Sequence, residues 1–342
     1  MTKKKDWTKG DLLNVSSSYW RGCSLQAGVR LGIFTAIDDG YLSLSDIATK
    51  IEADERGAEH LLNALSAMGL LVKEDDYYKN SSASLEFLSS KSPKYIGYII
   101  LHHHHILDGW AQLHEAVKIG RPIEKRSYGE EFERECFLMG MFNLAMGIAP
   151  NVSSQINLSG RRRLLDLGGG PGTYSIHFCL ANPNLTAVVF DRYTTEPFAA
   201  KTIDKFGLAD RISFAGGDFN VDPISGGPFD VAWLSHILHS NRPEECQSII
   251  DKTVDVIEPG GLIMVHDFIL DNTKDSPEFP ALFSLNMLIN NWGKSYSEKE
   301  VISMLENAGI SNISRHSFQG PNDSSILCGT IAKQKRVTDK SL

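Results

Sequence analysis

A glycine-rich segment, residues 166–173, has the composition of a ligand-binding turn. It ends a short apolar run and has the sequence Asp-Leu-Gly-Gly-Gly-Pro-Gly-Thr before a helix-like stretch. Glycines between a strand and a helix let a ligand approach the backbone closely. The dinucleotide fingerprint requires glycine at its first, third and sixth places, and the sixth place here is Thr173. The spacing therefore suits a cofactor without a pyrophosphate, whose ammonium and carboxylate groups the turn would meet.

Acidic side chains follow the next two apolar runs. Asp191 follows residues 186–190, and Asp218 and Phe219 follow residues 212–214. The first carboxylate can accept hydrogen bonds from both ribose hydroxyls. The second can accept from an adenine amine while Phe219 packs on the ring. Each aspartate alone could be an ordinary helix cap, but acidic residues at the ends of three consecutive strands favour a nucleoside site.

Four consecutive histidines, residues 102–105, are the most unusual local feature. On a helix, at most His102 and His105 share a face, so a metal would need a third ligand from elsewhere. We predict no metal site here; the alternatives are a substrate-pocket role for one or two of them, or a plain packed or solvated helix. The five cysteines are scattered without paired spacing, which argues against a disulfide framework or a zinc knuckle and favours a reducing cytoplasm.

These residues require a sheet whose strands end side by side. Short apolar runs alternate with helical stretches at residues 163–167, 186–190, 212–214, 231–234 and 262–265. The alternation predicts an α/β fold with a Rossmann-like, doubly wound, mostly parallel sheet. Residues 313–318 and 325–332 flank a Gly-Pro-Asn-Asp turn and predict a C-terminal antiparallel hairpin, which brings the sheet to seven strands.

The first hundred residues predict an α-helical winged-helix domain. Apolar residues recur at helical spacing over 11–37, Ser43 or Ser45 can cap a short helix, and another helix covers 58–68. Residues 70–78 predict two strands around an acidic turn. Winged helices often bind DNA, but the third helix lacks a basic face. The whole chain has 34 Lys and Arg against 42 Asp and Glu, a formal charge of −8, which argues against a nucleic-acid partner.

In this order, the motifs resemble those of class I S-adenosylmethionine-dependent methyltransferases of the caffeic acid and acetylserotonin O-methyltransferase type, including bacterial small-molecule members. The resemblance covers nearly the whole chain. It rests on the winged-helix start, residues 166–173, Asp191, residues 217–219, Leu238-His239 with Glu244-Glu245-Cys246, Glu258-Pro259-Gly260-Gly261 before a strand ending in Asp267, and residues 142–146. It implies S-adenosylmethionine as cofactor and S-adenosylhomocysteine as product.

The resemblance implies a cofactor site residue by residue. Gly168 and Gly170 would contact the methionine part, Asp191 the ribose, and Asp218 and Phe219 the adenine. The full implied set is Asp166, Gly168, Gly170, Gly172, Asp191, Arg192, Gly217, Asp218, Phe219 and Ser235. The chain departs from the plant pattern where Ser235 replaces a lysine, Asn241 a tryptophan and Pro243 an aspartate.

The resemblance also implies the acid–base chemistry. His239 matches the family's catalytic histidine, a general base for a phenol whose pKa is about 10. Asp267 stands where plant members have a glutamate that orients this histidine, and Ser295 replaces a second such glutamate; His236 or His266 could substitute. The candidate substrate contacts are His105, Phe142, Met146, His236, Met287, Asn290 and Trp292. For these candidates, the alternative to substrate contact is ordinary packing in the protein core.

At 342 residues, the chain is longer than a single hydrophobic core usually supports. We expect a winged-helix dimerisation domain at 1–105, a helical linker contributing to the substrate pocket at 106–158, and an S-adenosylmethionine-binding methyltransferase domain at 159–335. No stretch approaches the ~20 apolar residues of a membrane span, and the start lacks the apolar core of a signal peptide. We therefore expect a cytoplasmic protein without a membrane partner.

The predicted function is that of a homodimeric O-methyltransferase, which methylates a small aromatic or heteroaromatic hydroxyl by in-line transfer. Two alternatives remain open. One is an S- or N-methyltransferase of a small molecule such as a thioether acid, for which no base is needed. The other is a non-catalytic cofactor-sensing or DNA-binding regulator, because a fold does not determine a function.

Overall fold

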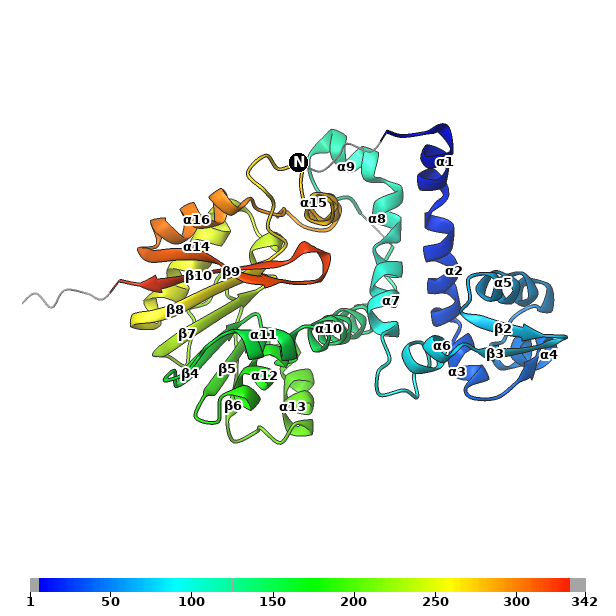
Figure 1. Ribbon diagram of the computed structural model, residues 1–342, viewed down its shortest axis with the longest axis horizontal. Helices are drawn as coiled ribbons and strands as arrows, with labels where there is room; N and C mark the ends of the chain where they lie inside the picture. The colour runs from blue at the N-terminus through cyan, green and yellow to red at the C-terminus, as the bar shows by residue number, and fades with distance from the viewer. Residues whose placement is uncertain (1–5, 125, 333–342) are drawn as a thin grey trace, which may run out of the picture. The chain divides into compact units, whose positions relative to one another are not determined.

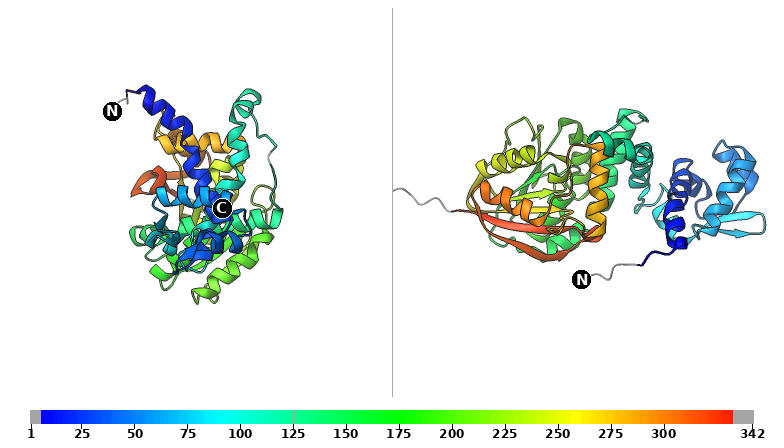
Figure 2. Two further views of the ribbon diagram at one scale, coloured as in Figure 1. Left: turned by 90° about the vertical axis from the view of Figure 1, so that its right-hand side faces the viewer. Right: turned by 90° about the horizontal axis from the view of Figure 1, so that it is seen from above.

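The computed structural model describes residues 6–124 and 126–332, which divide into two compact units. The N-terminal unit holds the chain up to Leu107 together with Ser127–Asn143. The sheet unit holds Asp108–Arg126 and the chain from Leu144 onward. Figures 1 and 2 show that the first is mostly helical and that the second is built around a large sheet. The stretch expected as one linker, 106–158, is divided between the two units, and the predicted domain boundaries remain a prediction.

The N-terminal unit combines short helices with a small antiparallel sheet, in which the strand order is β1-β3-β2. Its elements are α1 (Lys9–Ser17), α2 (Tyr19–Arg30), α3 (Ile33–Ile37), β1 (Leu42–Ser43), α4 (Leu44–Lys50), α5 (Glu55–Ala67), β2 (Leu71–Glu74), β3 (Tyr77–Asn80), α6 (Ser82–Phe87), α7 (Gly97–His105) and most of α10 (Glu130–Met146). Ile33, Phe34, Leu62 and Leu65 are completely buried in its core.

Side-chain caps determine where two of these helices begin. Ser43, rather than Ser45, caps α4, because its hydroxyl accepts a hydrogen bond from the Asp46 backbone N–H at 3.2 Å. Helix α5 begins three residues before the expected position because the Asp54 carboxylate accepts from the Gly57 N–H at 3.1 Å. The two strands around the acidic turn form as expected. The winged-helix assignment itself remains a prediction.

The sheet unit contains a seven-stranded sheet with the strand order β6-β5-β4-β7-β8-β10-β9. Its strands are β4 (Arg163–Leu167), β5 (Thr186–Asp191), β6 (Ile212–Gly216), β7 (Phe229–Ser235), β8 (Ile257–Asp267), β9 (Ile310–Gln319) and β10 (Ser325–Ile331). The β4–β5, β5–β6, β4–β7 and β7–β8 pairs are parallel, and β10 is antiparallel to β8 and β9. The predicted fold class, mostly parallel with a C-terminal hairpin, is confirmed.

Helices of the sheet unit cover both faces of this sheet (Figure 1). The unit contains α8 (Leu107–Ala111), α9 (Leu113–Ile119), α11 (Ala149–Gln155), α12 (Thr173–Ala181), α13 (Glu196–Lys205), α14 (Pro243–Asp255), α15 (Glu278–Asn290) and α16 (Glu298–Asn307), of which α11, α12 and α13 pack on one face of the sheet and α14 and α16 on the other. One core contains α11, α12 and α13 with Leu164 and Trp233, and the other contains α14 and α16 with Leu165 and Leu234. Successive strand residues thus face opposite cores.

Strand β8 is longer than the expected run of 262–265. It begins at Ile257, so that the Glu-Pro-Gly-Gly segment lies inside the strand and not before it. A register shift separates the Phe229–Ile257 pair from the Val231–Leu262 pair. Such a bulge is where a strand tolerates proline and glycine. Asp267 keeps its expected place at the end of the strand.

The strand order reverses direction between β4 and β7, which are neighbours in the sheet. From β4 the chain proceeds outward to β5 and β6, and then returns to β7 and β8 on the other side. Ligands of open α/β sheets bind at such a switch point, beyond the carboxyl ends of the strands. All residues predicted for cofactor binding or catalysis lie at or near this edge.

Asp166 near the end of β4 is a buried carboxylate with an incomplete set of partners. It is 1% exposed, and its Oδ2 accepts from the Ser175 N–H at 3.2 Å and the Ser175 hydroxyl at 2.7 Å. Its Oδ1 is buried without a hydrogen-bond partner among the described residues. Burial raises the pKa of Asp166 to about 6, although the bonds from Ser175 oppose the rise. The protein therefore bears a cost for holding this group ionised at neutral pH.

No single helix among the described residues is long and apolar enough to cross a membrane. Helices α10 and α11 pass that test as a pair, by length and composition alone, with a bend of 47° between them. Both bury side chains within the protein, including Cys136 and Leu138 of α10 and Val152 of α11.

We expect Asp166→Asn to stabilise the ligand-free protein at neutral pH. The folded-state pKa of about 6 exceeds the ordinary 3.8 by about two units, so the native state loses stability as pH rises from about 4 to about 6, and the deficit is constant above that. It amounts to about 3 kcal/mol at pH 7.5. Thermal unfolding should show a higher Tm for the variant at pH 7.5 and about half that gain at pH 5.

The exposed Asp275 provides the matched control for this comparison. Asp275→Asn should leave the Tm unchanged at both values of pH. An Asp166→Asn protein that unfolds at or below the Tm of the unsubstituted protein at pH 7.5 would show that the buried carboxylate is not destabilising.

Candidate active site

The turn between β4 and α12 leaves its backbone open to a ligand. Gly168, Gly170 and Gly172 have φ values of 64°, 54° and 79°, a conformation that other residues adopt with strain. A Cβ on Gly168 would lie 2.2 Å from the Cδ1 of Ile237, whereas a Cβ on Gly170 would meet nothing within 4 Å. The first glycine is required by packing. The second faces open space, where a ligand can contact the turn.

Asp191, at the end of β5, joins this turn to the neighbouring strands. Its Oδ2 accepts from the Gly170 N–H at 2.8 Å, and its Oδ1 accepts from the Arg192 N–H at 2.7 Å and the Thr195 hydroxyl at 3.2 Å. The Gly217 N–H donates to the Asp191 carbonyl at 2.9 Å. Burial raises the pKa of the Asp191 carboxyl, and its hydrogen bonds oppose the rise. A carboxylate has about four lone-pair sites, and these three bonds leave it able to accept from a ligand hydroxyl.

Asp218 and Phe219 lie on the loop after β6, beside the glycine turn. The Asp218 carboxylate is 3.4 Å from the Arg192 guanidinium, and a Cβ on Gly168 would lie 3.3 Å from the Phe219 ring. Lys252 of α14 donates to the Phe219 carbonyl oxygen and so holds the loop. Sequence reasoning missed Lys252, because a lysine on a helix distant in the chain has no local signal that marks such a contact.

Ser235, at the end of β7, lies on the opposite face of the sheet from Asp267. Its Oγ is 2.9 Å from Nδ1 of His266, whose Nε2 is 3.1 Å from the Oγ of Ser324. Burial, and then the nearby His236, lower the pKa of His266 well below its ordinary value. Because both of its ring nitrogens are engaged, His266 has a structural environment and not that of a base.

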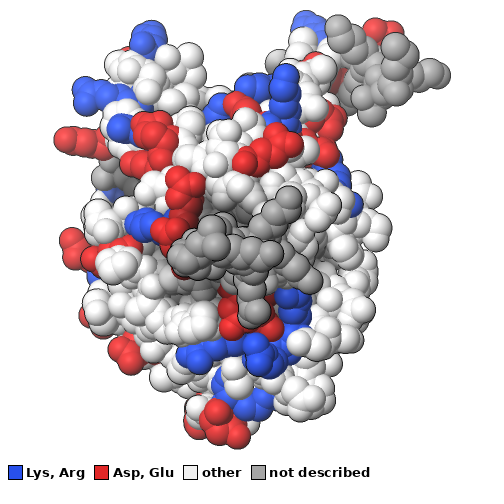
Figure 3. Space-filling model, turned by 90° about the vertical axis from the view of Figure 1, so that its left-hand side faces the viewer, with Lys and Arg blue, Asp and Glu red and all other residues white. Residues whose placement is uncertain are grey.

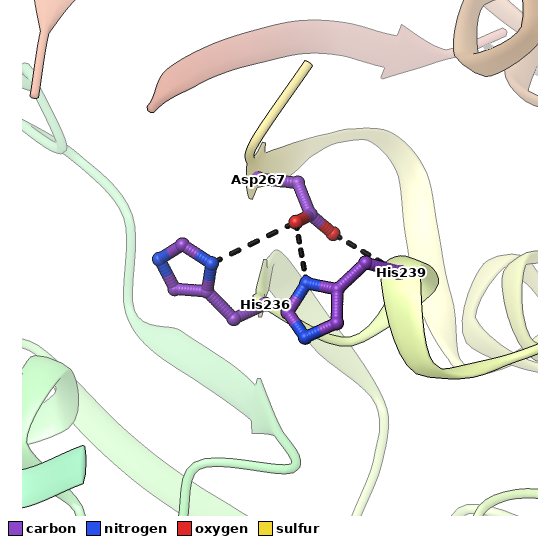
Figure 4. Close-up of side chains that lie close together, drawn as sticks. All are labelled: His236, His239 and Asp267. Atoms are coloured by element: carbon purple, nitrogen blue, oxygen red, sulfur yellow. Dashed lines mark hydrogen bonds and ion pairs between the residues drawn. The ribbon is translucent and has the colours of Figure 1, made fainter. Parts of the chain in front are cut away.

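His239 and Asp267 form a buried pair on the other face. His239 lies on the short 3-10 turn η2 (Leu238–Ser240), and its Nδ1 is 2.6 Å from Oδ1 of Asp267 (Figure 4). The second carboxylate oxygen accepts from the His239 backbone N–H at 3.3 Å. The two side chains are 10% and 6% exposed. An aspartate in place of the longer glutamate is therefore long enough to hold the imidazole.

The electrostatics of this pair favour an ionised aspartate. Burial alone would raise the pKa of Asp267, but the adjacent His239, which is hydrogen-bonded to it, and the nearby His236 hold it well below its ordinary range. The Phe268 backbone N–H also donates to Oδ1 at 2.8 Å. An ionised partner at Nδ1 assigns the ring proton to that nitrogen and leaves Nε2 of His239 as an acceptor.

His236 approaches the same carboxylate from another side (Figure 4). Its Nδ1 lies 3.7 Å from Oδ1 of Asp267, beyond hydrogen-bond range, and its side chain is 25% exposed. The His236 backbone has a φ of 58°, in the left-handed region that most residues avoid. This predicted substrate contact therefore lies beside the predicted base.

Ser295 does not take over the role of the second orienting glutamate. Its hydroxyl is buried without a hydrogen-bond partner among the described residues, while its backbone N–H bonds to the Ser284 Oγ at 3.1 Å. The same segment packs directly against the backbone of His239, because a Cβ on Gly293 would lie 2.0 Å from the His239 carbonyl oxygen. Asp267 alone of the two expected orienting positions holds the imidazole.

Three phenylalanines form a cluster beside His239, and sequence reasoning missed all of them. The His239 ring is stacked with Phe268 at 6.0 Å and meets Phe283 edge-on at 4.9 Å. Phe279 lies 5.0 Å from Phe268 and 5.9 Å from Phe283. The sequence signal that could have identified Phe279 and Phe283 was their i, i+4 spacing, which places both on one face of α15. The His239 imidazole thus has an apolar, aromatic environment on this side.

The other candidate substrate residues of the sheet unit have varied surroundings. Met287 is buried in α15. The Asn290 amide donates to the Asn286 carbonyl at 2.8 Å within the same helix. Trp292 is 53% exposed, with the Arg242 guanidinium 4.1 Å above its ring. The half-buried Met146 ends α10.

His105 and Phe142 belong to the N-terminal unit. His105 is 3% exposed, stacked on Tyr128 at 4.8 Å and edge-on to Phe132 at 5.4 Å. Phe142 is half-buried on α10. His105 therefore lies in an aromatic cluster of its own unit, and a role for either residue in substrate binding remains a prediction.

The sheet unit thus presents two kinds of chemistry at one edge. The glycine turn, with the unsatisfied Asp166 oxygen beneath it and carboxylates at the ends of β5 and β6, fits a ligand with an ammonium group and a ribose. Beyond β7 and β8, a buried imidazole with a carboxylate partner can accept a proton.

Comparisons with known proteins identify the family of the chain. The family model of the O-methyltransferase domain matches residues 103–311, and that of the O-methyltransferase dimerisation domain matches residues 13–90. A 3-hydroxy-5-methyl-1-naphthoate 3-O-methyltransferase of Streptomyces sahachiroi is 30% identical over 94% of this chain and 95% of its own. The N,N-dimethyltransferase OxyT of Streptomyces rimosus is 28% identical over 87% of this chain and 90% of its own.

The fold is also that of a protein solved with the demethylated cofactor. PigF, an S-adenosyl-L-methionine-dependent methyl transferase of a Serratia species, is 27% identical over 92% of this chain and 94% of its own. The structure of PigF with S-adenosylhomocysteine matches with a TM-score of 0.86 and 26% identity, covering 95% of this chain and 100% of that one. The chain therefore belongs to the O-methyltransferase family, as an S-adenosylmethionine-dependent methyltransferase of small molecules that resembles the caffeic acid and acetylserotonin enzymes.

Proposed function

We propose that this protein methylates a hydroxyl of a small aromatic or heteroaromatic acceptor, with His239 as general base. The observation that carries the proposal is the 2.6 Å contact between Nδ1 of His239 and Oδ1 of Asp267. With its proton held at Nδ1, the ring presents Nε2 to take the proton of the acceptor hydroxyl. A phenol with a pKa of about 10 is mostly protonated at neutral pH and requires such help.

Asp267 positions the base and does not itself take the proton. Its pKa, held low by His239 and His236 against the effect of burial, keeps it ionised while the imidazole is protonated. The ionised carboxylate then stabilises the imidazolium. The phenylalanines around His239 exclude water and reduce the competition between water and the acceptor.

The glycine turn and the carboxylates after β5 and β6 are the proposed cofactor site. S-adenosylmethionine supplies an electrophilic methyl group when bound. We assign Gly168, Gly170 and Gly172, above Asp166, to its methionine part. Asp191 and Arg192 would bind the ribose. Gly217, Asp218 and Phe219 would bind the adenine. Ser235 lies at the same edge of the sheet, but its hydroxyl is hydrogen-bonded to His266.

An aromatic acceptor is supported by the walls of the site and by one relative. Phe268, Phe279 and Phe283 provide flat apolar surfaces beside the base, of the kind on which aromatic rings stack. The Streptomyces sahachiroi relative bears the name of an enzyme that methylates a hydroxyl of a naphthoate. A bicyclic phenol is therefore a rational first acceptor to test.

N-methylation is the second candidate, because OxyT, 28% identical, is named an N,N-dimethyltransferase. An amine with a free lone pair needs no general base, so the buried His239–Asp267 pair favours the hydroxyl. A DNA-binding regulator has less support. Acidic and basic side chains are interspersed over the face drawn in Figure 3, and the net charge of −8 opposes a phosphate backbone.

A homodimer formed through the N-terminal unit is the proposed assembly. The dimerisation family model covers residues 13–90. Within and beside it, α1 and α2 expose large apolar side chains: Leu12, Leu13, Val15, Tyr19 and Trp20 are 56–63% exposed. Such an apolar patch is typical of a protein–protein contact, and a second copy of the chain is the simplest partner.

His239→Gln should lower kcat for a phenolic acceptor at pH 7 by about 10²- to 10⁴-fold, because the base is lost. The difference in kcat between the variant and the unsubstituted protein should become smaller as pH rises towards the pKa of the acceptor, about 10. There the phenolate forms without a base. Asp267→Asn should also lower kcat, since an amide cannot stabilise the imidazolium. Steady-state kinetics with labelled S-adenosylmethionine measures all three effects.

The His316→Gln variant is the matched control, because His316 lies on β9 outside this site. It should retain the kcat of the unsubstituted protein. Full activity of His239→Gln at pH 7 would contradict the proposed base and favour the N- or S-methyl alternative.

Asp191→Asn should weaken cofactor binding by about tenfold or more, because charge-assisted hydrogen bonds to ribose hydroxyls and to Gly170 are lost. Calorimetry with S-adenosylhomocysteine measures the Kd directly. Asp210→Asn, at an exposed position in the same unit, should leave the Kd unchanged. Equal affinity of the two variants would remove Asp191 from the cofactor site.

Trp20→Glu should convert the dimer into a monomer. A charge on an apolar contact is costly to bury, so the mass from light scattering should fall from twice 37.8 kDa to 37.8 kDa. Val117→Glu, which alters an exposed apolar residue of the sheet unit, should remain dimeric. A Trp20→Glu protein that stays dimeric would place the contact elsewhere.

A further inference from the structure

Two imidazoles and one carboxylate converge at the proposed catalytic base. His236, His239 and Asp267 each offer a ligand atom, and these atoms all lie within 4.8 Å of one another. Figure 4 shows both rings directed towards the carboxylate of Asp267. The catalytic proposal uses two of these residues, His239 and Asp267, and leaves the orientation of the third unexplained.

His236 is held in place at a conformational cost. Its φ of 58° lies in the left-handed region, which a residue other than glycine adopts with strain. Nδ1 of His236 is buried without a hydrogen-bond partner among the described residues, and faces Oδ1 of Asp267 at 3.7 Å. This ring nitrogen is therefore buried and directed at a carboxylate, yet it forms no hydrogen bond with it.

We propose that His236, His239 and Asp267 form a binding site for a divalent zinc-like cation. Zinc takes neutral imidazole nitrogens and carboxylate oxygens at about 2.0–2.2 Å in tetrahedral geometry, which places ligand atoms about 3.3 Å apart. The 3.7 Å separation of His236 from Asp267 is close to that spacing. The 2.6 Å contact of His239 with Asp267 must open by less than about 1 Å.

The ligand set and its exposure determine which cation fits. Two nitrogens and one oxygen favour zinc, cobalt, nickel or copper over magnesium and calcium, which prefer oxygen ligands. The His236 side chain is 25% exposed, so a cation can enter from solvent. Three protein ligands leave a fourth position for water.

Occupation of the site would inhibit methyl transfer, a consequence that rests on the proposed function. A cation bound at Nδ1 of His239 displaces the proton that Asp267 holds there. The ring then carries its proton on Nε2, taken up from solvent as the first is released. An Nε2 that already bears a proton cannot accept one from a hydroxyl.

The histidine run of α7 is the rival ligand within the chain. His102 lies edge-on to Phe137 at 5.4 Å, and His105 is stacked on Tyr128, so the two that share a helix face both pack on aromatic rings. His103 is exposed and His104 half-buried. A double variant, His103→Ala with His104→Ala, therefore reports on binding at that run.

The test is the stoichiometry and affinity of metal binding to the full chain, after chelation and gel filtration. We expect one equivalent of zinc by elemental analysis and a tetrahedral cobalt absorption spectrum. His236→Asn is the informative variant, because asparagine adopts positive φ more readily than most residues and lacks the imidazole. Its zinc affinity should fall by more than about tenfold, whereas the His103/His104 double variant should match the unsubstituted protein.

Less than one equivalent of zinc at micromolar concentrations, or a cobalt spectrum typical of octahedral ligation, would overturn the proposal without any variant. Equal zinc affinity of His236→Asn and the unsubstituted protein, or loss of binding in the double variant alone, would also overturn it. These measurements need no turnover. Zinc bound with the expected ligands while His239→Gln keeps full activity would refute the proposed base and leave the metal site standing.

Discussion

The parallel pairing of β4 with β5 on one side and with β7 on the other is the constraint on which the whole site depends. It brings the carboxyl ends of the strands to one edge, so that Asp166, Asp191 and the loop after β6 surround the glycine turn. The same pairing continues to β8 and places Asp267 beside the turn that carries His239. Residues about a hundred positions apart in the chain are thus brought to one edge of the sheet. Local interactions along the chain could not bring them together.

Two buried aspartates at this edge have opposite electrostatic environments. Asp166 has one serine as partner and an unsatisfied oxygen, and burial raises its pKa to about 6. Asp267 is as deeply buried, but the imidazole beside it holds its pKa far lower. Asp166 keeps one carboxylate oxygen without a partner among the described residues, whereas both oxygens of Asp267 accept hydrogen bonds within the protein. The Asp166 carboxylate therefore costs stability in the ligand-free protein, and the Asp267 carboxylate is satisfied.

The alternation of residues along β8 places the neighbouring residues His266 and Asp267 on opposite faces of the sheet. His266 faces the core with α12, where two serines engage both ring nitrogens, and Asp267 faces the opposite core with His239. A shift of one residue in the register of β8 would exchange these environments. The bulge opposite Val231 is thus part of the site, because it sets that register after the proline and glycines of the strand.

The sequence by itself determined the fold class, the strand that precedes the glycine turn, and the pair of His239 with Asp267, because apolar periodicity and short motifs are local properties of the chain. It also led to Asp191 and Asp218, which follow apolar runs. The helix starts at Asp54 and Ser43, and the full length of β8, needed the observed hydrogen bonds. Tertiary structure alone decided that the Ser295 hydroxyl does not bond to His239, that Phe268 and Phe283 pack on the His239 ring, and that His236 faces Asp267, because these contacts join segments whose separation in the chain leaves no local pattern.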